Sequence, residues 1–162
     1  MPGDETTSTL RVLGVVGAAA VIVSTFVAWY HFDVVIHAGR LEQRFAVPVN
    51  LWDFNTVAAL LLLAGAAAVA VLLNLPSAWM PREAALAAAA IGLAMAIYAL
   101  VRVIALPDLG VIPVGLAPTG VVPRTATHRD GGPFLTLAGA LTVTGGAVGA
   151  AVRSPRRVRI AD

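Results

Sequence analysis

The sequence predicts an all-α membrane protein: a four-transmembrane-helix bundle with a small outer β-hairpin and a Pro-rich outer loop. Hydrophobic residues make up 59% of the 162 residues and charged residues only 12%, about half of what soluble domains carry. The mean hydropathy is +0.86. The apolar residues gather in four stretches, each near the roughly 20 residues needed to cross about 30 Å of hydrocarbon.

The chain is expected to form one membrane domain, residues 1–162, in which apolar spans alternate with polar connections. In lipid every backbone N–H and C=O must be satisfied within its own segment, so each span should be helical despite its glycines and β-branched residues. The spans are expected at about 10–30, 54–73, 84–105 and 133–152, the outer loops at 31–53 and 106–132, the inner loop at 74–83 and the cytoplasmic tail at 153–162.

Residues at three span boundaries favour helix starts. Asp53 precedes the second span as a candidate N-cap, because a carboxylate can accept hydrogen bonds from unpaired backbone N–H groups. Pro81 and Glu83 suit the first turn of the third span, where a proline costs no hydrogen bond and an acid complements the helix dipole. Asp130 and Pro133 open the fourth span in the same way.

The first span has an alternative interpretation as a cleaved signal peptide. Asp4 and Glu5 lie beside Arg11, the apolar stretch is longer than a usual signal core, and no small-x-small cleavage site precedes Trp29. These features favour a retained span. Either interpretation leaves the other three spans in the same orientation.

Arginine placement predicts a multi-pass protein of the plasma membrane with both ends in the cytoplasm. With four spans the termini share a side, and that side collects more arginines than the opposite one: Arg11, Arg82, Arg153, Arg156, Arg157 and Arg159, against Arg40, Arg44, Arg124 and Arg129. Four of them follow the last apolar stretch directly. The net charge of +2 therefore indicates a membrane anchor and excludes a nucleic-acid partner.

Both outer loops carry patterns of their own. Residues 31–52 predict a β-hairpin, with Val34-Val35-Ile36 in one strand, the turn at Ala38-Gly39-Arg40, and a second strand with alternating apolar residues, Phe45, Val47, Val49 and Leu51. An isolated hairpin is marginal in water, so it must pack on the other loop or on a partner. Residues 111–125 repeat with a period of five, and their Pro and Gly spacing predicts an extended segment punctuated by type I turns.

Arg102 is the one charged residue expected to lie well inside a span. It lies four residues from the end of its helix, so it can extend to the headgroup layer. Two other interpretations are a structural ion pair with Asp53 or Asp108, and the binding of a substrate anion. No other ionisable residue lies well inside a span, which argues against an ion pump or proton relay.

Three histidines, His31, His37 and His128, fall on the predicted outer side. Together with Asp33 and Asp130 they could ligate a metal, but their spacing matches no metal-binding motif. We expect solvated loop histidines, no metal and no cofactor. The chain also has no Cys, which excludes disulfides and thiolate chemistry.

Small residues recur four apart in three spans and let helix backbones approach closely, which drives association in lipid. They serve either packing within one left-handed bundle or docking to another chain. The candidate packing residues are Ala20, Ser24, Ala28, Ala88, Gly92, Ala96, Gly145 and Gly149.

Two short motifs, Leu51-Trp52-Asp53-Phe54 and the segment 131–139 that opens the fourth span, together with a first span ending in aromatic residues, resemble small four-span membrane proteins of actinobacteria. By architecture alone the layout is similar to claudin-like tetraspans, which carry an outer sheet between their first two spans. The paired cysteines of the claudin outer loop are absent. The resemblance implies a shape and not a function.

The sequence predicts a non-enzymatic accessory or scaffold subunit that binds membrane lipid and another membrane or envelope protein, or a second copy of itself. The motivation is the elaborated outer loops, combined with the absence of a nucleophile–base pair, paired carboxylates or a phosphate-binding loop. The alternative is a carrier or pore for a small apolar or lipid-like molecule. An enzyme would require His31, Asp33, His128 and Asp130 to converge.

Overall fold

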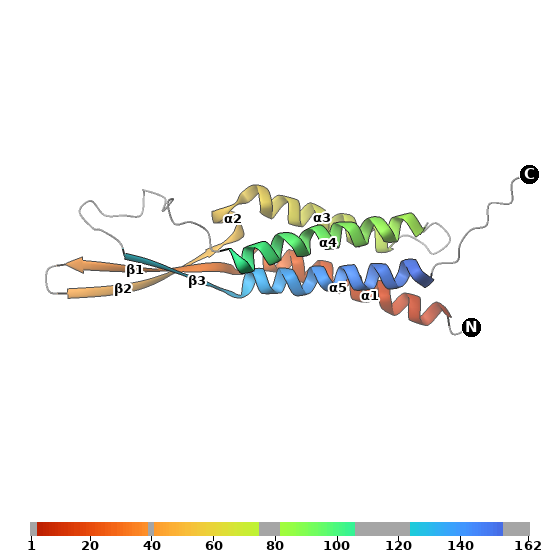
Figure 1. Ribbon diagram of the computed structural model, residues 1–162, viewed down its shortest axis with the longest axis horizontal. Coiled ribbons are helices and arrows are strands. Elements are labelled where there is room, and N and C mark those ends of the chain that lie inside the picture. The colour runs from red at the N-terminus through yellow and green to blue at the C-terminus, as the bar shows by residue number, and fades with distance from the viewer. Residues whose placement is uncertain (1–2, 39–40, 75–81, 106–123, 154–162) are drawn as a thin grey trace, which may run out of the picture.

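The computed structural model describes residues 3–38, 41–74, 82–105 and 124–153. Long helices lie side by side as a bundle, and a ribbon of strands extends from one end of it (Figure 1). The beginning of the first helix and the end of the last lie together at the opposite end of the bundle. The elements in order are α1 (Gly3–Ser24), β1 (Ala28–Ala38), β2 (Leu41–Asn50), α2 (Leu51–Phe54), α3 (Thr56–Asn74), α4 (Arg82–Ile104), β3 (Arg124–Arg129) and α5 (Gly131–Arg153).

Three of the described helices, α3, α4 and α5, are long and apolar enough to cross a membrane, with 19, 23 and 23 residues. The apolar part of α1 is shorter, at Ser8–Ser24. The expected spans at 54–73, 84–105 and 133–152 thus coincide with helices to within a few residues at each end.

The distribution of side-chain sizes in the bundle is that of a membrane protein. The buried positions are mostly alanine and glycine, whereas large apolar side chains such as Leu61, Val71 and Ile104 point outward and are 67%, 63% and 69% exposed. Exposing such a surface to water would cost a free energy of about 25 cal/mol for each Å² of apolar area. Lipid does not, and close backbone packing through small residues is what holds helices together there.

The first helix differs from the expected span at both ends. It begins at Gly3 and ends at Ser24, and Trp29 and Tyr30, predicted to close the span, belong to β1. The reason is local, because each of the last four carbonyls of α1 finds a donor outside the regular helix pattern. The bonds are Ser24 Oγ to Val21 O (2.6 Å), Thr25 Oγ1 to Ile22 O (2.8 Å), Phe26 N to Val23 O (3.1 Å) and Trp29 Nε1 to Ser24 O (2.8 Å).

The predicted hairpin is present and belongs to a larger sheet. β1 pairs antiparallel with β2 over its whole length, from Ala28 opposite Asn50 to Ala38 opposite Leu41. Leu51, expected in the second strand, instead opens α2. The turn at 39–40 lies outside the described residues.

A third strand that the sequence interpretation missed pairs with the other edge of β1. It is β3, and the strand order is β2-β1-β3 with antiparallel pairing throughout. Most of the five-residue repeat at 111–125 lies outside the described residues, but its last two residues, Arg124 and Thr125, form the beginning of β3. The two segments predicted to be outer loops therefore contribute strands to one sheet.

Two of the predicted helix starts are observed, and one is wrong. Glu83 lies in the first turn of α4, and the Asp130 carboxylate accepts from the N–H of Gly131 at the start of α5 (2.8 Å). Asp53, expected to be an N-cap, lies inside the short helix α2. Asparagines provide the caps: Asn50 Oδ1 accepts from Asp53 N (3.1 Å), and Asn55 Oδ1 accepts from Ala58 N (3.0 Å).

Glycines allow close contact between α1 and α5. A Cβ on Gly17 would lie 2.6 Å from the carbonyl oxygen of Gly139, and one on Gly146 would lie 2.7 Å from that of Leu10. Only a hydrogen atom fits at these two glycines, so the backbones are in direct contact. Gly139 and Gly146 are seven residues apart, which is the spacing of left-handed helix packing.

Candidate functional site

Four polar side chains of the sheet form two pairs, which we name the His–Asp cluster: His31, Asp33, His128 and Asp130. His31 lies directly opposite His128 in the register of β1 and β3. The side chains of residues two apart point to the same face of a strand, so Asp33 and Asp130 join the histidines there. His31 Nδ1 lies 3.5 Å from Asp130 Oδ2, His128 Nε2 lies 3.3 Å from Asp33 Oδ2, and the imidazoles stack with centroids 5.2 Å apart.

The exposure of the His–Asp cluster limits its contribution to stability. The four side chains are 34–55% exposed, and exposed ion pairs of this kind contribute about 0–1 kcal/mol each. Each pair is ionic only while its histidine is protonated. A carboxylate beside an imidazole can also orient it for proton transfer. Within the described ranges, no group of three or more His, Cys, Asp or Glu side chains is placed to hold a metal ion.

Two buried aromatic residues, Trp29 and Tyr30, join the base of the sheet to the helices. The Trp29 ring lies 6.1 Å from the ring of Tyr98 in α4. The Tyr30 hydroxyl donates to the carbonyl of Arg102 (3.3 Å), and its ring meets that of Phe54 edge-on at 5.6 Å. Burial raises the pKa of Tyr30, while the positive charge of Arg102 acts in the opposite direction.

Residues at the end of β3 complete this junction. Arg129 Nη2 donates to the carbonyl of Ile104 (2.9 Å), so a positive charge meets the carboxyl end of α4, where the helix dipole favours it. The N–H of Asp130 donates to the carbonyl of Trp29 (3.0 Å). The sheet is thereby fixed to the end of α4 and to the start of α5.

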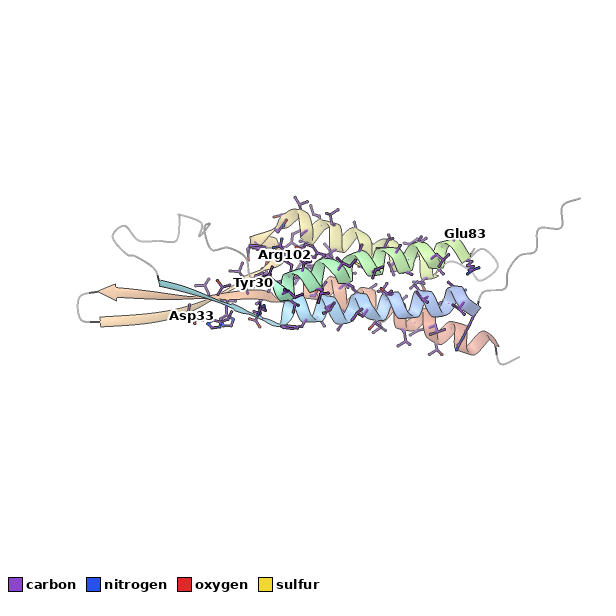
Figure 2. The ribbon with its side chains drawn as sticks, viewed as in Figure 1. Tyr30, Asp33, Glu83 and Arg102 are labelled. Atoms are coloured by element: carbon purple, nitrogen blue, oxygen red, sulfur yellow. The ribbon has the colours of Figure 1, made fainter. Side chains whose placement is uncertain are left out.

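Arg102 lies in the last turn of α4 with its guanidinium against aromatic rings. Its Cζ is 5.3 Å from the centroid of Phe54 and 5.4 Å from that of Tyr98, distances at which a cation is attracted to the ring face. Figure 2 shows Arg102 and Tyr30 where the sheet meets the helices. In the described structure Arg102 forms no ion pair with Asp53, whose side chain is exposed. Asp108 lies outside the described residues, so that pairing stays a prediction.

A groove separates α3 from α4 on the side of the bundle near Arg102. Its volume is about 300 Å³, and its lining is almost wholly apolar. The buried polar atoms without a hydrogen-bond partner among the described residues include the hydroxyl of Tyr98, a lining residue, and Nε of Arg102. The lining residues are Ala58, Leu61, Leu62, Gly65, Ile91, Ala94, Met95 and Tyr98.

Five of the predicted packing residues face a neighbouring helix or are buried in the bundle. Ala20 and Ser24 face α5, where Ser24 Oγ shares a 2.6 Å hydrogen bond with Thr136 Oγ1, and Ala88, Gly92 and Ala96 are buried in α4. Gly92 is held against α5, since a Cβ on it would lie 2.7 Å from Thr144 Oγ1 and 2.8 Å from a methyl of Val143.

The other three predicted packing residues lie elsewhere than expected or make looser contacts. Ala28 belongs to β1 and not to a helix. Gly145 is exposed with nothing within 4 Å of an added Cβ, and the atoms nearest to a Cβ on Gly149 belong to the side chain of Leu10. The tight contact of α5 is made by Gly139 and Gly146, because a one-residue offset turns a helical position by about 100° away from the interface.

Sequence reasoning named all four members of the His–Asp cluster but did not pair them. The pairs depend on β3, and the signal for β3 was the alternation of Thr125 and Thr127, a β-favouring pattern at the end of the second outer loop. The groove left no signal, because its lining residues look like any other apolar helix face.

No family model, no curated protein and no solved structure matches this chain.

Proposed function

We propose that the protein is a non-enzymatic integral membrane accessory or scaffold subunit that binds another membrane or envelope protein through its three-stranded sheet. The observation that carries this proposal is the position of the sheet. Both predicted outer loops contribute strands to it, it extends well beyond the helices, and past its base no described helix lies over either of its faces (Figure 1).

A sheet in this position favours a partner for two physical reasons. Small sheets are stable when a hydrophobic face is covered. Past its base this sheet has no described helix on either face (Figure 1), so a protein outside the bundle would have to cover it. β2 and β3 are the edge strands of the sheet. Their free edges present backbone N–H and C=O groups, with which an added strand of another protein can pair.

In this proposal α1 is the fourth span of the plasma membrane, and both chain ends are cytoplasmic. Its 22 residues measure about 33 Å at 1.5 Å per residue. Its glycine contacts with α5 run from Leu10 to Gly17, so α1 lies beside a helix long enough to span. With the carboxyl end of α5 beside the start of α1, the sheet faces the outside.

Site-specific photo-crosslinking in intact cells tests the partner proposal. A crosslinking residue at Ala46 or Val47, both exposed in β2, should yield one discrete adduct with a second protein. The matched control is Val71, which is exposed on the lipid-facing side of α3 and should yield no protein adduct. An adduct of twice the chain's mass would identify the partner as a second copy. Absence of adducts from both sheet positions would contradict the proposal.

A second candidate function is a carrier for a small apolar or lipid-like molecule, and the groove between α3 and α4 favours it. Ligand pockets start at roughly 300 Å³, and this apolar groove reaches about that volume. Retention of one lipid molecule per chain after purification would support this function, and the experiment below measures it.

A further inference from the structure

The groove between α3 and α4 ends at a polar group that can receive an anion. On α4 the lining residues Ile91, Ala94, Met95 and Tyr98 follow one another at spacings of three, one and three, so they share one face of the helix. Arg102 comes four residues after Tyr98 and continues that face. An apolar path therefore leads along α4 to a guanidinium.

Arg102 has unused hydrogen-bonding capacity at this point. Its Nε is buried and has no hydrogen-bond partner among the described residues. The rings of Phe54 and Tyr98 hold the guanidinium in place without neutralising it. A guanidinium fixed against aromatic rings is well suited to bind phosphate oxygens, because its planar donors match them in geometry.

The Tyr98 hydroxyl is a second hydrogen-bond donor, next to the Arg102 guanidinium. It is buried and has no partner among the described residues, and a buried hydroxyl without a hydrogen bond costs about 1–3 kcal/mol. Its ring also lies under the Arg102 guanidinium. A ligand with an acceptor group at this depth would satisfy both side chains at once.

We propose that this groove binds one acyl chain of an anionic phospholipid, whose phosphate accepts hydrogen bonds from Arg102 and Tyr98. The apolar lining selects an acyl chain, and the uncompensated charge at its end selects a negative headgroup. This proposal deepens the second candidate function and rests on the membrane location proposed above. It does not depend on the partner of the sheet.

Native mass spectrometry of the purified full chain tests it, with phosphatidylglycerol and phosphatidylcholine of identical acyl chains as probes. The wild-type chain should retain one phosphatidylglycerol and bind phosphatidylcholine at least tenfold more weakly. Arg102→Gln should weaken phosphatidylglycerol binding about tenfold or more, because it removes a charge-assisted hydrogen bond. Arg102→Lys keeps the charge and loses the planar fork, so an intermediate affinity is expected.

Two control variants separate this site from general attraction to lipid. Arg82→Gln removes an exposed charge at the other end of α4 and should leave binding unchanged. Ala94→Trp fills the groove from an exposed position and should abolish retention of the lipid, whereas Ala90→Trp, one turn away and outside the lining, should not.

Three results would overturn the proposal: equal affinity for the two lipids, equal losses in Arg102→Gln and Arg82→Gln, or undiminished binding in Ala94→Trp. A dimer that Ala94→Trp dissociates would also overturn it, because a second copy would then occupy the groove. A chain that stays monodisperse in plain buffer would overturn the membrane location itself. Loss of crosslinks from the sheet would leave the lipid result standing.

Discussion

Single residues decide how the sheet is attached to the bundle. Trp29 and Tyr30 are both fully buried, yet each directs its polar atom at a helix carbonyl, Trp29 at Ser24 and Tyr30 at Arg102. Aromatic residues at a membrane boundary ordinarily place such atoms in the headgroup layer. Here protein carbonyls take the place of headgroups, which fixes the sheet rigidly to the helices.

The buried phenol of Tyr30 makes stability depend on pH. Burial raises its pKa above the ordinary value of about 10, so the folded state holds the proton more tightly than the unfolded state does. The stabilisation is complete below that ordinary value and is lost as the pH rises toward the folded-state pKa. The chain has no Lys and no Cys, so no lysine or cysteine side chain titrates in this window.

Thermal unfolding in mild detergent at about pH 8 and about pH 10.5 measures this effect. The wild-type Tm should be lower at the higher pH than at the lower pH. This decrease in Tm should be smaller in Tyr30→Phe, whose side chain cannot ionise. Identical falls in the wild type and in Tyr30→Phe would contradict the assignment.

Among the elements, α5 has the central role in the bundle. It packs on α1 through Gly17 and Gly139, on α4 through Gly92, and on the base of β1, where a Cβ on Gly132 would collide with the ring of Trp29. The seven-residue spacing of Gly132, Gly139 and Gly146 places all three on one side of the helix. Contact between backbones replaces the interlocking of large side chains in this interface.

Gly17→Val should disrupt the contact between α1 and α5. Its Cβ would lie 2.6 Å from a backbone oxygen that cannot move aside, so we expect a loss of about 2 kcal/mol or more of unfolding free energy. Gly145→Val makes the same chemical change at an exposed position with nothing within 4 Å, where an effect within about 0.5 kcal/mol is expected. Denaturant titration followed by circular dichroism in detergent compares them, and equal losses would refute the glycine interface.

On the scale of the whole molecule, the bundle and the sheet form one elongated body with two different ends. Glu83 lies at one end, and Asp33 lies in the sheet beyond the other (Figure 2). Large apolar side chains cover the outside of the helices between them. That surface is suited to lipid.

Single cysteines introduced into this Cys-free chain test the orientation. A membrane-impermeant maleimide should label Val47→Cys on intact cells, and should label Ser8→Cys and Glu83→Cys only after permeabilisation; all three positions are exposed in the structure. The pattern follows if α1 crosses the membrane. Labelling of Ser8→Cys and Val47→Cys from the same side would show that it does not.

The sequence by itself determined the features that depend on near neighbours in the chain. Lipid requires each apolar stretch to satisfy its own backbone, so the positions of α3, α4 and α5 follow from apolar length alone. The pairing of β1 with β2 follows from alternation on two sides of a short turn. Glu83 and Asp130 mark helix starts because their effects reach only one turn.

Only the tertiary structure decided the contacts between distant segments. The hydrogen bond between Ser24 and Thr136 joins residues 112 positions apart, and β3 becomes a strand because β1 offers it a free edge. The His–Asp cluster, the glycine face of α5 and the aromatic partners of Arg102 arise in the same way. An alanine- and glycine-rich helix has many equivalent faces, so which face is buried depends on the helix that packs against it.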